Sequence, residues 1–178
     1  MQVAFKLGVK YREGFMKNRY IGRTFIMPGQ RTRKRSVKQK LNPIEIEFRD
    51  KRVLLVDDSI VRGHTSKNIV KMVRDCGANK VFLASASPPI RHQNVYGIDM
   101  PATKELIGYN RSIRRIKKYI KADELIYQDL EDLTRSASIG NPKIKKFEDS
   151  VFTGKYRVGN ITEEFLKNLE QTRSSLPK

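Results

Sequence analysis

RVLLVDDSIVRGHTSKNIV, residues 52–70, is the stretch that decides the fold, because a strand pattern passes directly into a helix pattern within it. Its first part, RVLLV, contains the apolar run VLLV with a β-branched valine at each end, which is typical of a strand buried on both faces of a parallel sheet. Asp57 and Asp58 end this run, and a short loop containing Gly63 follows. We therefore predict a strand, a polar turn and a helix in direct succession.

The residues that follow complete a βαβ unit. TSKNIVKMVRDCGANK, residues 65–80, predicts a helix that Thr65 or Ser66 caps and Gly77 ends. One face of this helix is apolar and carries Ile69, Val70, Val73 and Cys76. KVFLASAS, residues 80–87, predicts a second buried strand. A strand, a helix and a strand joined by short links predict the α/β class with a parallel sheet.

Weaker patterns predict the remaining elements. Short strands are expected in IEIEF, VYGID and ELIYQ, at residues 44–48, 95–99 and 124–128. Helices are expected at residues 101–110, 112–120, 130–138 and 161–173, the last with Thr162 as its N-cap. Turns are expected at Pro28–Gly29, at Asn42–Pro43 and in VFTGKY, residues 151–156.

The charge of the chain predicts an anionic partner. Lys and Arg number 37 against 19 Asp and Glu among 178 residues, for a formal net charge of +18. Such an excess favours polyanions or phosphorylated small molecules. Cys76 is the single cysteine, which excludes an internal disulfide and fits the reducing cytoplasm. No apolar run approaches the roughly 20 residues that span a bilayer, so no membrane partner is expected.

Residues 17–40 form the most basic segment of the sequence. This segment has nine basic residues and no acidic one. It predicts either a solvated basic loop or a loop that orders over an anionic ligand, and the composition alone leaves both open.

The residues around Asp57 and Asp58 predict a ligand site. Open parallel sheets bind ligands at the carboxyl ends of their strands. A helix N-terminus attracts anions, and Gly63 allows close approach of the backbone to a phosphate. The two carboxylates suit ribose hydroxyls or Mg²⁺, so the stretch favours a phosphorylated sugar. The alternative is a turn that the aspartates merely cap.

Four segments carry a resemblance to a known family: residues 53–66, VLLVDDSIVRGHTS; residues 17–30, KNRYIGRTFIMPGQ; residues 94–101, NVYGIDMP; and residues 151–156, VFTGKY. Together they resemble the amidophosphoribosyltransferases, which contain the signature of type I phosphoribosyltransferases, and along the chain they follow that family's order. The resemblance covers nearly the whole chain. It implies synthesis of 5-phosphoribosylamine from phosphoribosyl pyrophosphate and glutamine-derived ammonia, the first step of purine biosynthesis.

The resemblance implies a type I phosphoribosyltransferase-like parallel sheet flanked by helices and incomplete at its N-terminal side. Residues 1–150 would form the partial domain, and residues 151–178 a C-terminal extension with a helix. The glutaminase domain, whose N-terminal cysteine is the nucleophile, is not matched. The first part of the transferase domain is not matched either, so we expect a partial chain of the enzyme.

The resemblance also implies roles for individual residues. Asp57 and Asp58 would bind ribose hydroxyls and Mg²⁺. The 5-phosphate would lie on Ser59, Ile60, Val61, Arg62, Gly63, His64 and Thr65. His64 departs from the family, which usually has threonine there.

Four further roles follow from the resemblance. Arg23 and Lys40 would face pyrophosphate from a loop that closes over the substrate. Tyr20 would act in catalysis and, with Leu106, line an ammonia passage. The inhibitory purine nucleotides would lie against two residues, Lys17 and Pro101. The full-length enzyme would be a cytoplasmic homo-oligomer, and without further cysteines no iron–sulfur cluster is expected.

Other interpretations compete with this one. The chain could be a non-catalytic phosphoribosyltransferase-fold protein that regulates or binds nucleic acid. RSIRRIKKYIK, residues 111–121, fits either a basic patch or a solvated amphipathic helix. Cys76 is expected in the core rather than in catalysis, and His92 has no second ligand at metal spacing. A phosphoribosyltransferase that acts on a base has less support, because residues 17–30 match the amidotransferases.

Overall fold

A three-stranded parallel sheet organises the molecule. The computed structural model describes residues 1–17 and 41–175. Strands β3 (Arg52–Asp57), β4 (Lys80–Ser85) and β5 (Glu124–Tyr127) lie in the order β3-β4-β5, and both neighbouring pairs are parallel. The βαβ unit predicted from residues 52–87 is therefore confirmed, as is the strand predicted at residues 124–128.

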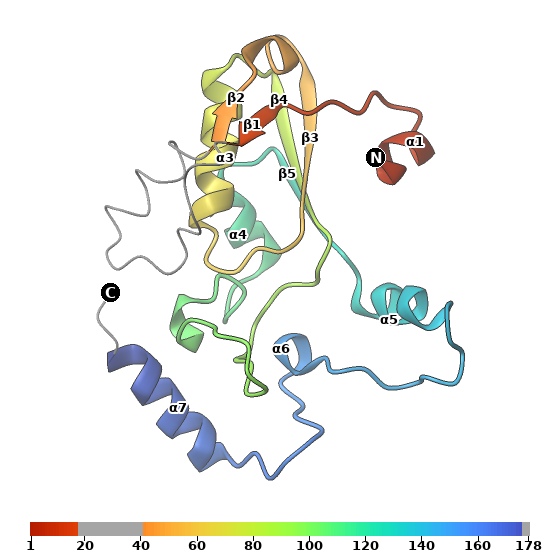
Figure 1. Ribbon diagram of the computed structural model, residues 1–178. Helices are drawn as coiled ribbons and strands as arrows, with labels where there is room; N and C mark the ends of the chain where they lie inside the picture. The colour runs from red at the N-terminus through yellow and green to blue at the C-terminus, as the bar shows by residue number, and fades with distance from the viewer. Residues whose placement is uncertain (18–40, 176–178) are drawn as a thin grey trace.

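Two helices cover one face of this sheet. Helices α3 (His64–Asp75) and α4 (Ile113–Ile120) lie on the same side of the strands (Figure 1). Val73 of α3, Ile116 and Ile120 of α4, and Val81 of β4 have no exposed surface. They belong to one apolar cluster, which also contains the buried Val70 of α3. This cluster is the core of the domain.

Among residues 1–17 and 41–175, no helix covers the opposite face of the sheet. Val56 is 57% exposed, Ile126 is 52% exposed and Leu54 is 36% exposed, while Phe82 and Ala84 are half-buried. The prediction that β3 and β4 are buried on both faces is therefore wrong for this face. An apolar strand is suited to burial on both sides, but burial requires a covering layer, and α3 and α4 lie on one side only.

A second, smaller sheet lies beside the first. Strands β1 (Phe15–Lys17) and β2 (Leu41–Pro43) pair antiparallel, and Phe15 packs on Phe48 with ring centroids 5.1 Å apart. The turn predicted at Asn42–Pro43 is therefore wrong. A two-stranded ribbon has free edges, where the missing N–H of a proline is tolerated.

Residues 44–48 form a helical turn rather than the predicted strand. The 3₁₀ helix η2 (Glu45–Glu47) begins after Ile44, whose carbonyl accepts from Glu47 N at 2.9 Å. Ile46 is 76% exposed and only Phe48 is buried. An alternating pattern forms a strand only where a partner strand is available. In this segment Phe48 alone is buried, so only one residue attaches it to the core.

Residues 94–105 also differ from their prediction. No strand forms at residues 95–99, because the Asn94 side chain accepts from Tyr96 N at 2.9 Å and from Ile98 N at 3.0 Å. Such local bonds compete with strand pairing. The helix predicted at 101–110 is reduced to the 3₁₀ helix η3 (Thr103–Glu105).

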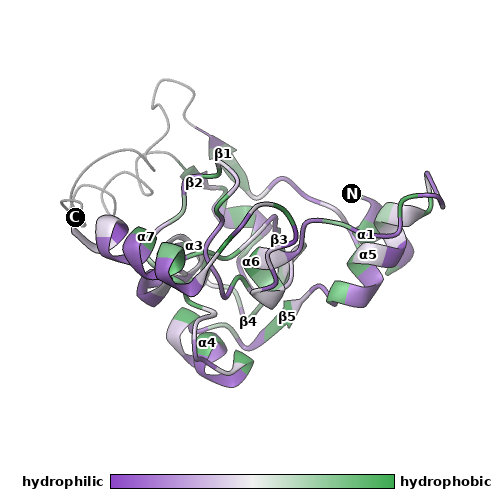
Figure 2. Ribbon diagram, turned by 90° about the horizontal axis from the view of Figure 1, so that it is seen from below, coloured by the Kyte–Doolittle hydropathy of each residue, from purple (hydrophilic) through white to green (hydrophobic). Residues whose placement is uncertain are grey.

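The terminal helices complete the fold. In Figure 1, helix α1 (Gln2–Lys6) lies to one side of the sheet, and α5 (Leu130–Ser138), α6 (Ser150–Thr153) and α7 (Glu163–Ser175) lie beyond the carboxyl ends of its strands. The predicted α5 and α7 are confirmed, and Thr162 Oγ1 accepts from Phe165 N at 3.1 Å as expected of a cap. The turn predicted at 151–156 contains the end of α6. Hydrophilic and hydrophobic residues alternate along α4 and α7 (Figure 2).

Helix α7 is attached to the loop that follows β4. Glu170 of α7 accepts from Thr103 N at 2.7 Å and also contacts the Gln93 amide. Arg173 donates to Asn94 O at 3.1 Å. Within residues 1–17 and 41–175, no helix has the length and apolar character needed to cross a membrane.

The difference between the two sheet faces leads to a stability prediction. Leu83→Ala removes a side chain that is 2% exposed in the core, and we expect a loss of about 2–5 kcal/mol in the free energy of unfolding. Leu54→Ala makes the same change on the uncovered face, and we expect a loss of about 1 kcal/mol or less. Urea unfolding followed by circular dichroism measures both, and equal losses would contradict the one-sided core.

Candidate functional site

The carboxyl ends of the three strands place polar groups in one row. Asp57 of β3 pairs with Ser85 of β4, which pairs with Tyr127 of β5. Ser85 donates to Ser87 O at 2.9 Å. The Tyr127 hydroxyl is a buried atom without a hydrogen-bond partner in the described part of the chain, and burial raises the pKa of Tyr127 to about 12. The sequence pattern did not point to Ser85 or Tyr127, because each ends a strand from a different part of the chain.

Asp57 and Asp58 lie at the end of β3, as predicted. Asp57 Oδ1 accepts from Asp58 N at 3.0 Å, and Asp58 Oδ1 accepts from Ser59 Oγ at 2.8 Å. Among residues 1–17 and 41–175, no ion pair involves either carboxylate. Two acidic groups therefore remain without cationic partners there, in a chain whose net charge is +18.

Burial changes the acidity of this pair. Partial burial raises the pKa of Asp57 above its usual value, and the Asp58 N–H that its carboxylate accepts opposes this rise. The negative charge of Asp58 adds to it. A cation or a hydrogen-bond donor bound here would stabilise the charged form of Asp57.

The loop after the aspartates has the features of an anion-binding turn. Gly63 has φ +75° and occupies the N-cap position of α3, so the prediction of Thr65 or Ser66 as cap is wrong. Within the two described ranges, no hydrogen bond has a backbone N–H of residues 59–63 as its donor. The first N–H groups of α3 have no acceptor inside the helix. Several backbone N–H groups that could donate to a ligand therefore lie in this one turn, where the helix dipole also favours negative charge.

A distant segment holds this loop in place. Ile107 N donates to Val61 O at 2.8 Å, and Arg62 Nε donates to Glu105 Oε2 at 2.8 Å. A Cβ added at Gly63 would lie 2.2 Å from Ile107 Cδ1, so the loop packs tightly on this segment. Nothing in the local sequence indicated Glu105 or Ile107, because more than 40 residues separate Arg62 from Glu105.

The last two residues of the predicted phosphate turn, His64 and Thr65, and the neighbouring Ser66 differ in their surroundings. His64 is the first residue of α3, is exposed, and its Nδ1 lies 2.8 Å from Tyr119 Oη. Thr65 is half-buried, whereas Ser66, in the first turn of α3, is 3% exposed. Ile60 is 1% exposed and belongs to the core cluster, so this residue attaches the loop to the core.

The other predicted site residues are placed as follows. Tyr20, Arg23 and Lys40 lie outside the described residues, and their roles stay predictions. Lys17 is exposed at the end of β1, and Pro101 is half-buried in the loop before η3. The remaining residue, Leu106, has no exposed surface and packs with Ile90 and Met100.

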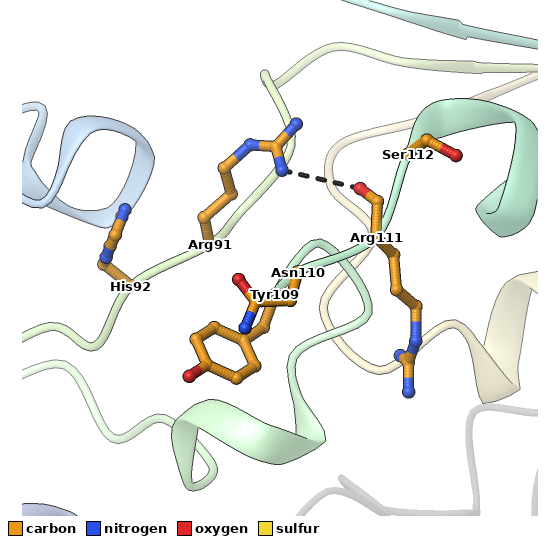
Figure 3. Close-up of a pocket in the computed structure, with 6 residues that line it drawn as sticks. All are labelled: Arg91, His92, Tyr109, Asn110, Arg111 and Ser112. Atoms are coloured by element: carbon orange, nitrogen blue, oxygen red, sulfur yellow. Dashed lines mark hydrogen bonds between the residues drawn. The ribbon is translucent and has the colours of Figure 1, made fainter.

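A hollow of about 360 Å³ lies between residues 91–92 and residues 109–112. Its lining consists of Arg91, His92, Tyr109, Asn110, Arg111 and Ser112. Arg91 Nη1 donates to Gly108 O at 2.9 Å and to Arg111 O at 3.5 Å. Figure 3 shows the Arg111 side chain extending away from Arg91, so the two guanidinium groups do not converge on one ligand.

Cys76 and His92 do not form a reactive site. Cys76 is half-buried and packs against the core, as predicted, and burial raises the pKa of its thiol. Burial, together with the Arg91 charge, lowers the pKa of His92. Within the part of the chain that the structure describes, no three His, Cys, Asp or Glu residues gather as a metal site.

Comparisons with known proteins agree with the resemblance. The chain is 56% identical over 178 residues to an amidophosphoribosyltransferase of Pseudomonas aeruginosa, covering all of this chain and 36% of the relative. It is also 56% identical to the Pasteurella multocida enzyme, of which it covers 35%. No family model matches the chain.

A solved structure shows the same fold. Glutamine phosphoribosylpyrophosphate amidotransferase from B. subtilis, complexed with ADP and GMP, superposes with a TM-score of 0.74 at 38% identity. The alignment covers 94% of this chain and 37% of that one. The fold, together with the acidic pair at the end of β3, thus defines a phosphoribosyltransferase-type α/β protein. More narrowly, the chain is related over its whole length to the amidophosphoribosyltransferases and spans about a third of the length of these curated relatives.

The raised pKa of Asp57 predicts a change of stability with pH. Because the folded state binds the Asp57 proton more tightly than the unfolded state, ionised Asp57 lowers the free energy of unfolding at neutral pH. We expect Asp57→Asn to raise the melting temperature at pH 7 and to have no effect below about pH 4, where the unfolded chain also protonates aspartate.

Thermal unfolding across pH, followed by circular dichroism, tests this expectation. Asp99→Asn, at an exposed carboxylate without an ion pair in the described part of the chain, is the matched control. A lower melting temperature for Asp57→Asn at pH 7 would contradict the expectation, because it would show that the ionised carboxylate stabilises the folded chain.

Proposed function

We propose that this chain supplies the phosphoribosyl pyrophosphate site of an amidophosphoribosyltransferase. The observation that carries the proposal is made within residues 1–17 and 41–175: the Asp57 and Asp58 carboxylates have no cationic partner there, and the backbone N–H groups of residues 59–63 have no acceptor. Carboxylates suit ribose hydroxyls, and the turn suits a phosphate. The enzyme would transfer the ribosyl group to ammonia from glutamine, the first step of purine biosynthesis.

The residues of the chain would act by binding and positioning. Asp57 and Asp58 would accept hydrogen bonds from the ribose hydroxyls, and residues 59–65 would hold the 5-phosphate. Arg23 and Lys40 would neutralise the leaving pyrophosphate, and loop closure would exclude water that hydrolyses the sugar. Ammonia is already a nucleophile, so no strong general base is required.

Mg²⁺ is the metal that this site would use. Mg²⁺ binds through one or two carboxylates together with substrate oxygens, and the adjacent Asp57 and Asp58 carboxylates fit that requirement. When bound, it would offset charge on the pyrophosphate and favour the ionised form of Asp57, whose pKa burial raises.

Further partners belong to the same proposal. Tyr20 and Leu106 would line the ammonia passage, and Lys17 and Pro101 would contact inhibitory purine nucleotides. The B. subtilis relative, which is complexed with ADP and GMP, supports purine nucleotides as ligands. A homo-oligomer in the cytoplasm is the proposed setting, and the single Cys76 fits a reducing compartment.

Calorimetry with phosphoribosyl pyrophosphate tests the proposed function. We expect binding that requires Mg²⁺ and a dissociation constant that rises at least about tenfold in the double variant Asp57→Asn, Asp58→Asn, since each bond to a charged group contributes about 1.5–3 kcal/mol. The double variant Glu131→Gln, Asp132→Asn removes the same charge from α5 and should bind as the unaltered chain does.

Failure to bind the sugar phosphate would overturn the proposal. If the chain instead bound DNA with a steep dependence on salt concentration, the nucleic-acid-binding alternative would be supported.

A further inference from the structure

Tyr119 of α4 contacts three residues where the proposed phosphate loop passes into α3, namely Gly63, His64 and Lys67. A Cβ added at Gly63 would lie 3.4 Å from Tyr119 Cε1, so the ring packs against this glycine. Tyr119 Oη lies 2.8 Å from His64 Nδ1, and either atom can be the donor. Lys67 Nζ lies 4.5 Å from the centroid of the tyrosine ring, in cation–π geometry.

The tyrosine itself is held on a rigid support. Ile116 and Ile120, the residues three before and one after it in α4, have no exposed surface and belong to the core. The remaining contacts of the loop, from Val61 and Arg62, go to Ile107 and Glu105. At the end of the loop where α3 begins, Ile107 packs against Gly63, and Tyr119 contacts both Gly63 and His64.

We propose that Tyr119 is a positioning residue for phosphate binding, acting through its hydrogen bond to His64. The bond holds the first turn of α3 so that its N–H groups and those of the loop keep the orientation that binds an anion. This inference rests on the proposed function of the loop. A preorganised loop loses less conformational entropy on binding, so breaking the bond should weaken affinity.

The pair contributes more to binding than to folding, because it lies at the surface. Tyr119 is 36% exposed and His64 is exposed, so the hydrogen bond competes with water. Tyr119→Phe keeps the ring against Gly63 and Lys67 and removes only the hydroxyl. Tyr96→Phe is the matched control, since Tyr96 is also 36% exposed and its hydroxyl donates to Val158 O at 2.9 Å, at a site outside the phosphate loop.

A double-mutant cycle on the full chain tests the proposal. Calorimetry with phosphoribosyl pyrophosphate and Mg²⁺, and with inorganic phosphate as a smaller probe, is run on the unaltered chain, Tyr119→Phe, His64→Ala and the double variant. We expect each single change to weaken binding by about threefold to tenfold, and the double change to add nothing further. Tyr96→Phe should leave both affinities unchanged.

Nuclear magnetic resonance gives a second measurement, because the chain has only two histidines. The variant His92→Gln assigns the His64 ring signals. We expect phosphate to shift the His64 signals in the unaltered chain, and Tyr119→Phe to reduce this shift while the melting temperature stays the same.

The outcomes separate the two proposals. Binding by the unaltered chain together with additive effects in the cycle, or with no effect of Tyr119→Phe, would overturn the role of Tyr119 alone. Absence of binding by the unaltered chain would overturn the proposed function and this inference with it.

Discussion

The packing of α3 and α4 on one face of the β3–β4–β5 sheet is the contact on which the rest of the structure depends. It buries Val73, Val81, Ile116 and Ile120 completely and so fixes where each strand and helix begins. The start of α3 lies close in the chain to the end of β3, and the loop between them is held by bonds from Val61 and Arg62 to Ile107 and Glu105. A binding turn made of backbone groups needs such a support, because its donors are useful only when their directions are set.

The site keeps groups that do not favour folding. Asp57 is partly buried with a raised pKa, and Gly63 takes a conformation that other residues rarely adopt. Backbone N–H groups of residues 59–63 have no acceptor in the described part of the chain. Each of these features would be balanced by a ligand that brings hydroxyls, a cation and a phosphate. Their concentration within seven residues distinguishes this turn from an ordinary capped strand end.

The exposed apolar face of the sheet can be set beside the length of the chain relative to its relatives. Leu54, Val56 and Ile126 are exposed on strands whose composition is that of a sheet with two covered faces. The curated relatives are about three times as long as this chain, which covers 36% of the first of them. An apolar face of this kind favours association, and the net charge of +18 opposes association between copies of the same chain.

The sequence by itself determined the βαβ unit, the parallel sheet, and the position of Asp57, Asp58 and Gly63 in one turn. These features depend on residues close together in the chain, whose periodicity and backbone preferences are local. Strands were wrongly predicted at residues 44–48 and 95–99, because the apolar pattern there lacks a partner strand and Asn94 bonds the backbone instead. Only the tertiary structure decided that, in the described part of the chain, one sheet face is exposed, and that Glu105, Ile107 and Tyr119 contact residues 61–64. Contacts between residues 40 or more positions apart follow from how helices and strands pack in space, and no local pattern records them.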